Sequence, residues 1–343
     1  MADDGDPDSM SQLGLMYLYG IEVEQNFIKA YNLSKKLADE GHPISQFIMA
    51  DLYREGNVVP KNLEEAAKWC RLAAEQGLAD AQFNLGISYY LGEGLPKSKA
   101  EAVKWFKMAA DQDLASAQFN FGVAYLFGEG VTKNKAEAIK WFQKAADQGL
   151  ACAQYNLGLA YDYGQGLPKN QVKAAKWYQK AADQGDPMAQ FNLGSSYLAG
   201  HGVAKNLAEA LKWYKMAAKQ GSPQAQLSLG NFYNFGQVVT KDITQAVKWY
   251  KKAAKQGLDI AQLNLGSCYY FGEGVAQNLT EAIKWYQKAA NQGLAAAQFY
   301  LGKIYYYGEG APKNQAEALI WLQKAAAQGH AEAKKLYKKA SKP

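Results

Sequence analysis

The sequence predicts an all-α protein, built as a linear array of helix–turn–helix units, and three observations support this. The first is that its eight tryptophans recur every 36 residues, at Trp69, Trp105, Trp141, Trp177, Trp213, Trp249, Trp285 and Trp321. The second is a pair of one-sided apolar patterns of helical period within each interval, and the third is a set of glycines at matching places. A single globular domain gives no reason for a constant interval, whereas an array of identical structural units does.

Each unit is predicted to contain two antiparallel helices, A and then B. In the unit that starts at Leu78, the residues Ala81, Leu85 and Tyr89 recur at i, i+4 and i+8. The second pattern follows i, i+3, i+4, i+7 and i+8 through Ala102, Trp105, Phe106, Ala109 and Ala110. Both are apolar stripes of helical period without strand alternation.

Glycine and asparagine mark the helix ends. A Gly-x-Gly closes helix A, as at Gly92 and Gly94, and a further glycine such as Gly77 closes helix B. Helix B opens with an N-cap at Asn62, Asn134, Asn170, Asn206, Asp242, Asn278 and Asn314. A glutamate three residues after five of these caps, as at Glu65, predicts a capping box.

A glycine also recurs in the middle of helix A, as at Gly86, where it costs roughly 1 kcal/mol relative to alanine. We therefore expect another helix to cross closely there, with Trp or Tyr filling the adjacent space, and the tryptophans to lie in the core between units.

Nine units are predicted over residues 6–329, with a C-terminal capping helix over 330–343. The units are about 6–41, 42–77, 78–113, 114–149, 150–185, 186–221, 222–257, 258–293 and 294–329. The first has Leu33 in the Trp place, and the last helix has lysines at core positions. Such atypical ends are expected because a terminal repeat lacks one neighbour.

The motif A-x-A-Q-F-N-L-G-x-x-Y-x-x-G-x-G followed by N-x-x-E-A-x-K-W-Y-x-K-A-A-x-Q-G resembles the Sel1-like repeat family, which is related to tetratricopeptide repeats. The resemblance implies a right-handed α-α superhelix, with helix A on the concave face and helix B on the convex face. It also implies an adaptor that assembles protein complexes, in signalling, in membrane-protein degradation, or in bacterial envelope and host-interaction systems.

A cysteine-rich branch of this family supplies a rival hypothesis, a hydrolase acting on β-lactams. That branch pairs two cysteines in each repeat. This chain has three cysteines in all, Cys70, Cys152 and Cys268, and they occupy different positions in their units. The per-repeat pair is missing, which argues against the hydrolase.

The net charge of +6 comes almost entirely from lysine. A row of lysines precedes the tryptophans, at Lys68, Lys104, Lys140, Lys176, Lys212, Lys248 and Lys284. We interpret it as a solvated convex face whose long stems shield the aromatic residues, because acidic residues interleave with it. Arginine, the usual phosphate ligand, occurs only at Arg54 and Arg71, so no nucleic-acid partner is predicted.

The sequence predicts no enzyme, no cofactor and no metal site. His42, His201 and His330 are far apart, no Cys/His cluster has metal-ligand spacing, and the Gly-x-Gly turns follow helices rather than strands. No apolar run is long enough to span a membrane. Met1–Met10 is acidic and lacks the apolar region of a signal peptide. A secreted or periplasmic protein is favoured if a signal peptide was trimmed, and a cytoplasmic one otherwise.

Three helix-A positions are predicted to face a concave groove. The first reads Gln12, Ile48, Asn84, Asn120, Asn156, Asn192, Ser228, Asn264 and Tyr300. The second reads Tyr19, Glu55, Leu91, Phe127, Tyr163, Ala199, Phe235, Phe271 and Tyr307. The third varies most and reads Ile87, Val123, Leu159, Ser195, Asn231, Ser267 and Lys303.

Each position has a binding and an internal interpretation. The amides could bond an extended peptide backbone, or else a neighbouring helix or the next amide. The aromatic residues could anchor a partner, or else pack against the following helix B. Variation at the third position would encode a specific partner, since a structural role would repeat. The predicted partner-binding residues are Asn84, Asn120, Asn156, Asn192, Asn264, Tyr300, Phe127, Tyr163, Phe235, Phe271, Tyr307, Ser195, Asn231 and Lys303.

The sequence therefore predicts a non-catalytic, monomeric scaffold that binds a peptide or a partner domain in the groove. By resemblance, its setting is that of a bacterial secreted virulence protein engaging host membrane-trafficking proteins. The alternatives are the β-lactam hydrolase and a structural organiser of the cell envelope that works by self-association.

Overall fold

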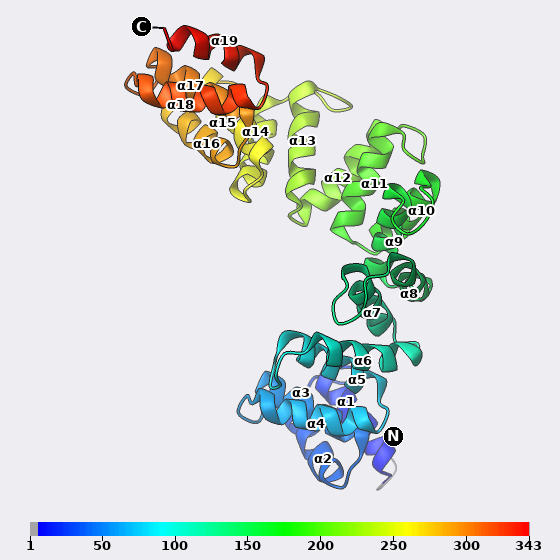
Figure 1. Cartoon of the computed structure of the whole chain (residues 1–343). Helices are drawn as coiled ribbons and strands as arrows, with labels where there is room; N and C mark the ends of the chain where they lie inside the picture. The colour runs from blue at the N-terminus through cyan, green and yellow to red at the C-terminus, as the bar shows by residue number, and fades with distance from the viewer. Residues whose placement is uncertain (1–5, 343) are drawn as a thin grey trace. The chain divides into compact units, whose positions relative to one another are not determined.

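The computed structural model describes residues 6–342, which form nineteen α-helices and no strand (Figure 1). Two parts of the chain lie outside the described residues: residues 1–5, in the acidic N-terminal stretch, and residue 343, the last of the predicted capping helix. The chain divides into two compact units, residues 1–170 and residues 171–343.

Within each unit, every helix packs against the helices that precede and follow it in that unit. The first unit contains α1 (Pro7–Tyr19), α2 (Phe27–Asp39), α3 (Pro43–Glu55), α4 (Leu63–Glu75), α5 (Ala79–Leu91), α6 (Lys99–Asp111), α7 (Ala115–Phe127), α8 (Lys135–Asp147) and α9 (Ala151–Tyr163). The second contains α10 (Gln171–Asp183), α11 (Pro187–Ala199), α12 (Leu207–Lys219), α13 (Pro223–Phe235), α14 (Ile243–Lys255), α15 (Asp259–Phe271), α16 (Leu279–Asn291), α17 (Ala295–Tyr307), α18 (Gln315–Ala327) and α19 (Ala331–Ala340). The predicted all-α array of helix pairs is confirmed, with odd-numbered helices as A and even-numbered helices as B.

The N-caps of helix B form as predicted, but the capping box does not. The Asn62 side chain accepts hydrogen bonds from the backbone N–H groups of Glu64 and Glu65, both at 3.1 Å. The Glu65 carboxylate does not accept the backbone N–H of Asn62, because it pairs with Lys68 at 2.6 Å. The cap's own N–H donates instead to the carbonyl of Tyr53 in helix A, at 2.9 Å. Helix A therefore supplies the bond that the box would have made.

The two glycines after helix A are required for different structural reasons. Gly92 has a φ of 84° and ends α5 in the left-handed conformation. At Gly94, with a φ of 68°, a Cβ atom would lie 1.9 Å from the backbone carbonyl oxygen of Leu63. The second glycine is therefore required because the turn passes against the start of the preceding helix B.

The residue after each tryptophan fills the space beside the mid-helix glycine. The prediction of tyrosine there is confirmed at Tyr214, Tyr250 and Tyr286, whereas the prediction of tryptophan is wrong. A Cβ atom on the mid-helix Gly86 would come within 2.6 Å of the Phe106 ring, and Phe106 is buried. Trp105 itself is half-buried. It packs against an apolar cluster that contains Leu85 and residues of the preceding repeat, such as Cys70. The predicted close crossing at glycine is confirmed.

Glutamine, rather than asparagine, forms an amide network that links successive repeats. Gln82 is buried and donates to the carbonyl of Ala74 in the preceding helix B at 3.2 Å. Gln112 donates both to Gln82 Oε1 at 2.8 Å and to the carbonyl of Gly77 at 2.9 Å. The same three bonds recur 144 residues later, where Gln226 and Gln256 take the places of Gln82 and Gln112. This network adds a second donor to the Ala74 carbonyl, which already accepts the Gly77 N–H, and it provides a donor to the Gly77 carbonyl after helix B.

Candidate protein-binding surface

The last residue of helix A is exposed in most repeats, and in most of these it is a large apolar residue. The first unit contributes Tyr19, Leu91, Phe127 and Tyr163, and the second contributes Phe235, Phe271 and Tyr307. We call these residues the exposed helix-A set. Phe127 is 64% exposed, and Tyr163 and Phe235 are each 66% exposed. Each of these three rings therefore leaves most of its surface open to solvent, whatever part of it packs against the following helix B.

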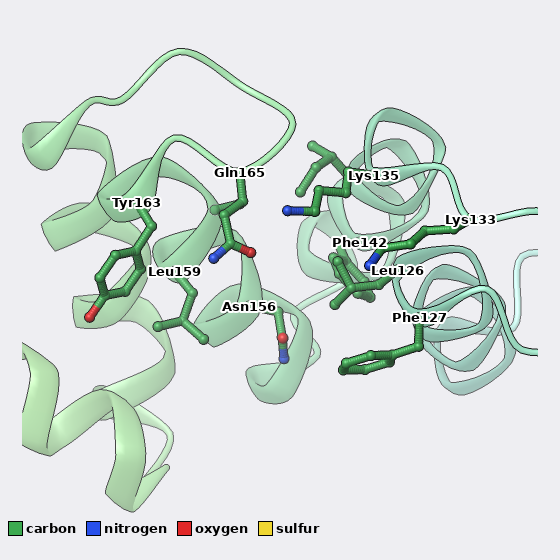
Figure 2. A pocket seen from close by; sticks show the side chains of 11 residues that line it. Leu126, Phe127, Lys133, Lys135, Phe142, Asn156, Leu159, Tyr163 and Gln165 are labelled. Atoms are coloured by element: carbon green, nitrogen blue, oxygen red, sulfur yellow. The ribbon is translucent and has the colours of Figure 1, made fainter.

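Two members of the set line an open pocket of about 370 Å³ in the first unit. Figure 2 shows Phe127 on one side of it and Tyr163 on the other, with Asn156 and Leu159 between them. The buried Phe142 ring and Ile139 also line it. The remaining lining residues are Leu126, Lys133, Lys135, Ala160 and Gln165. The pocket thus combines an apolar floor with amide and ammonium groups, a composition typical of binding sites.

The asparagines of the first position do not form a ladder between repeats where their bonds are defined. Asn120 Nδ2 donates to the carbonyl of Ser116 at 2.8 Å, and Asn156 Nδ2 donates to that of Cys152 at 2.7 Å. These bonds stay within each side chain's own helix. They fix the side chain and leave the Oδ1 atom able to accept an N–H from another molecule. Asn84, Asn192, Asn264 and Tyr300 are half-buried at equivalent places.

Variation at the third position follows the buried aromatic residue of the next helix. Where that residue is tyrosine in the second unit, its hydroxyl meets a polar group: Ser195 at 3.0 Å from Tyr214, Asn231 at 2.9 Å from Tyr250, and Ser267 at 3.1 Å from Tyr286. Where it is Phe106 or Phe142, the position holds Ile87 or Val123. These contacts give Ser195, Asn231 and Ser267 an internal role, because each satisfies a buried hydroxyl. The pattern does not extend to Leu159, which precedes Tyr178 in the sequence, or to Lys303, so a partner-specific role of this position stays a prediction.

Lys303 and Tyr307 lie at the other end of the chain, beside the C-terminal helix α19. They line a cleft of about 290 Å³ together with Phe299, Leu336 and Lys335. Lys303 Nζ also donates to the Tyr270 hydroxyl at 3.2 Å, which gives this lysine an internal contact as well.

The helix-B lysines behave as a solvated face. Lys68, Lys104, Lys140, Lys212 and Lys284 each pair with a glutamate three residues earlier. A second row lies over the tryptophan rings, with Nζ 4.2 Å from the Trp141 centroid for Lys144 and 4.2 Å from the Trp249 centroid for Lys252. These contacts use the lysines to cover the aromatic residues, as the sequence indicates.

One cluster has the residue types of a hydrolytic triad. His42 Nδ1 lies 3.0 Å from Ser11 Oγ, and His42 Nε2 lies 2.7 Å from Asp8. The sequence does not indicate this cluster, because Asp8 and Ser11 lie on α1 whereas His42 directly precedes α3. Ser11 is fully buried and also bonds Ser45 at 2.6 Å, so the hydroxyl is not presented to a substrate. The cluster ties α1 to α3.

Other reactive groups are scattered. Cys70 and Cys268 are buried on α4 and α15, and burial raises the pKa of both thiols, to about 12 and about 11. Among residues 6–342, no group of three His, Cys, Asp or Glu side chains could hold a metal ion. None of the described helices combines the length and the apolar character needed to cross a membrane.

Stacked helix pairs that carry exposed residues at the same place in each repeat define a tetratricopeptide-like α-solenoid, a class that generally serves as a scaffold for protein interaction. The chain belongs to the Sel1 repeat family. The family model matches nine times, at residues 7–42, 43–78, 79–114, 115–150, 153–186, 187–222, 223–258, 259–294 and 295–330.

Two solved structures are similar over nearly the whole chain. A protective antigen of uropathogenic Escherichia coli strains with an SLR fold is 33% identical, with a TM-score of 0.77, over 98% of this chain and 80% of that one. A Sel1 repeat protein from Oxalobacter formigenes is 34% identical, with a TM-score of 0.68, over 99% of this chain and 95% of that one. No curated protein matches the chain.

Proposed function

We propose that the protein is a non-catalytic scaffold that binds a segment of a partner protein on the helix-A face. The observation that carries this proposal is the exposure of large apolar side chains at one place in successive repeats. A side chain such as Phe127, left 64% exposed, gains apolar burial only when another molecule covers it. An internal role would have buried it, as it did Phe142.

An extended peptide segment suits this face better than a compact ligand does, because the exposed residues are spread over several repeats. The exposed apolar residues recur at the same place in most repeats, so a segment lying across neighbouring repeats such as those of Phe127 and Tyr163 would meet an aromatic anchor in each. Between anchors, the amide of Asn156 offers an acceptor for a backbone N–H without demanding a particular side chain. Affinity would therefore come from a few aromatic contacts, and specificity from the residues around them.

The setting that we propose is a bacterial protein acting outside the cytoplasm on host proteins of membrane traffic, as a monomer. The similar Escherichia coli protein is a protective antigen, which supports contact with a host. The helix-B face is a poor alternative surface, because many of its lysines already contact a glutamate or a tryptophan, as Lys104 and Lys144 do.

The experiment that tests this function is site-specific photocrosslinking with the full chain. A benzophenone amino acid replaces Phe127 or Phe235 in the exposed helix-A set, and it replaces Lys104 or Lys248 on helix B in matched controls. The variants are incubated with extracts of bacterial envelopes and of eukaryotic cells, and crosslinked proteins are identified by mass spectrometry.

We expect a discrete partner to crosslink from Phe127 or Phe235 and not from the lysine positions. Crosslinking from the helix-B positions alone would place the partner on the other face and contradict the proposal. Absence of a crosslinked protein from all four positions would also contradict it.

A further inference from the structure

The pocket between α7 and α9 has a counterpart one repeat earlier that is almost closed. That counterpart measures about 80 Å³, against about 370 Å³ for the open pocket. Every residue that lines the small cavity has its equivalent, 36 positions later, in the lining of the large one. The two sites therefore share one architecture, and a few side chains decide whether the space is filled.

Four of the seven equivalent lining residues differ between the two sites, and two of these differences remove a polar bridge that closes the smaller one. In the closed site the Tyr90 hydroxyl donates to Glu129 at 2.7 Å, and Lys99 pairs with the same carboxylate at 2.7 Å. This three-residue bridge spans the junction between repeats. In the open site, Leu126 stands in place of Tyr90 and Gln165 in place of Glu129, so neither the phenol nor the carboxylate is present.

The open site keeps the lysine of this bridge but lacks the glutamate with which it pairs in the closed site. Lys135 is the equivalent of Lys99, it is exposed, and it lines the open pocket. Among the described residues no carboxylate lies within ion-pair distance of it, and the pocket lining contains two lysines and no acidic residue. In Figure 2 the Lys135 ammonium group points into the space in front of Gln165. An unpaired cation above an apolar floor favours a ligand that carries a negative charge beside an apolar group.

We infer that this open pocket is the specificity site of the scaffold, which takes an apolar side chain of the partner segment while Lys135 pairs with an adjacent Asp or Glu. The inference rests on the proposed function, because Phe127 and Tyr163 both line the pocket and belong to the exposed helix-A set. The pocket is small, near the low end of the roughly 300–1,000 Å³ of ligand sites, so it holds one side chain. The rest of the segment continues along the exposed residues.

The chain supplies its own control variants. Leu126→Tyr with Gln165→Glu installs the bridge of the neighbouring repeat and closes the pocket with residues that this architecture already accommodates. Tyr90→Leu with Glu129→Gln does the opposite and opens a second pocket. Lys135→Gln removes only the exposed charge and leaves the apolar space unchanged.

The test is selection of a displayed random peptide library against the immobilised full chain, followed by calorimetry with synthetic copies of the selected peptides. We expect selected peptides to share an apolar residue next to Asp or Glu. The closing variant should weaken their binding by about tenfold or more, and Lys135→Gln by about two- to fivefold. The opening variant should bind a second copy of the peptide. Circular dichroism confirms that each variant folds.

The outcomes separate the inference from the function on which it rests. Peptides that bind the closing variant with unchanged affinity, but lose binding when Phe235 or Phe271 is changed to serine, would overturn the inference and leave the proposed function standing. Failure to select any peptide would overturn both. Equal binding of decanoate and of the selected peptides, with the same dependence on Lys135, would make the occupant a small apolar anion and overturn the assignment to a protein segment.

Discussion

The bond between Tyr250 and Asn231 decides whether variable helix-A positions serve the core or a partner. The Tyr250 hydroxyl donates to Asn231 Oδ1 at 2.9 Å, the Tyr250 ring is buried, and burial raises the pKa of its hydroxyl. Val123 and Phe142 occupy the equivalent places in the first unit. We predict that Asn231→Val destabilises the protein, because it leaves a buried hydroxyl without its acceptor.

The magnitude follows from the cost of an unpaired buried polar group. Asn231→Val should lower the free energy of unfolding by about 1–3 kcal/mol. Tyr250→Phe should cost less, about 0.5–1.5 kcal/mol, because the half-buried Asn231 can still reach water. The double variant recreates the Val123 and Phe142 pair, so we expect it to be more stable than Asn231→Val alone, with a coupling energy of about 0.5–3 kcal/mol.

Urea denaturation monitored by circular dichroism measures these differences for the four proteins of the cycle. Hydrogen exchange of peptides from α13 and α14 shows that the loss is local, since a repeat array can unfold in parts. If Asn231→Val leaves the stability unchanged, or if the double variant is no more stable than that single variant, the bond does not stabilise the core, and a partner-binding role for Asn231 is favoured instead.

Three further predictions concern packing, the thiols and pH. Gly86→Ala should lower the free energy of unfolding by about 1 kcal/mol or more, because overpacking against Phe106 outweighs the gain in helix propensity; an unchanged melting temperature would contradict the close crossing. In a variant whose only thiol is Cys70, burial raises the pKa of that thiol to about 12, so a disulfide reagent at pH 8 should react only after urea unfolds the chain. Rapid reaction of the folded protein would show that the site opens. The hydrogen bond from Lys99 holds the pKa of Glu129 below its ordinary value of 4.5. The ionised Glu129 therefore stabilises the folded protein fully above pH 4.5, and this stabilisation is lost as the pH falls through the lowered pKa. Glu129→Gln should therefore remove part of the acid sensitivity of the melting temperature, and an identical pH profile would refute the bridge.

The helix pairs could be predicted from the sequence because their signals are local and repeated. The spacing of tryptophan repeats every 36 residues along the chain. The Gly92 turn and the Asn62 cap each depend on a few neighbouring residues. The partner of Gly86 was harder to predict. Trp105 and Phe106 are adjacent, both apolar and equally periodic, so their spacing does not tell which one faces glycine and which one faces the preceding repeat.

Contacts between repeats escaped prediction because they join residues that are distant in sequence. The Gln82 and Gln112 network was signalled only by two recurring glutamines, whose pairing depends on how the helices cross. Likewise, Tyr90 and Glu129 are 39 residues apart, so nothing in the local pattern indicates that they close a cavity. The exposure of the last helix-A residues could be predicted, because the residue before a helix-ending glycine lies at a surface turn, whereas their binding role stays a prediction.

Hydrogen exchange of the full chain, with and without a peptide selected from the library, shows directly whether a segment binds on the helix-A face at this pocket. We expect slower exchange in the last turns of α7 and α9, in the peptides that contain Phe127 and Tyr163. We expect no change in α6, or in the part of α8 that follows Phe142. Protection confined to helix B or to α19, with none around Phe127, would contradict this expectation.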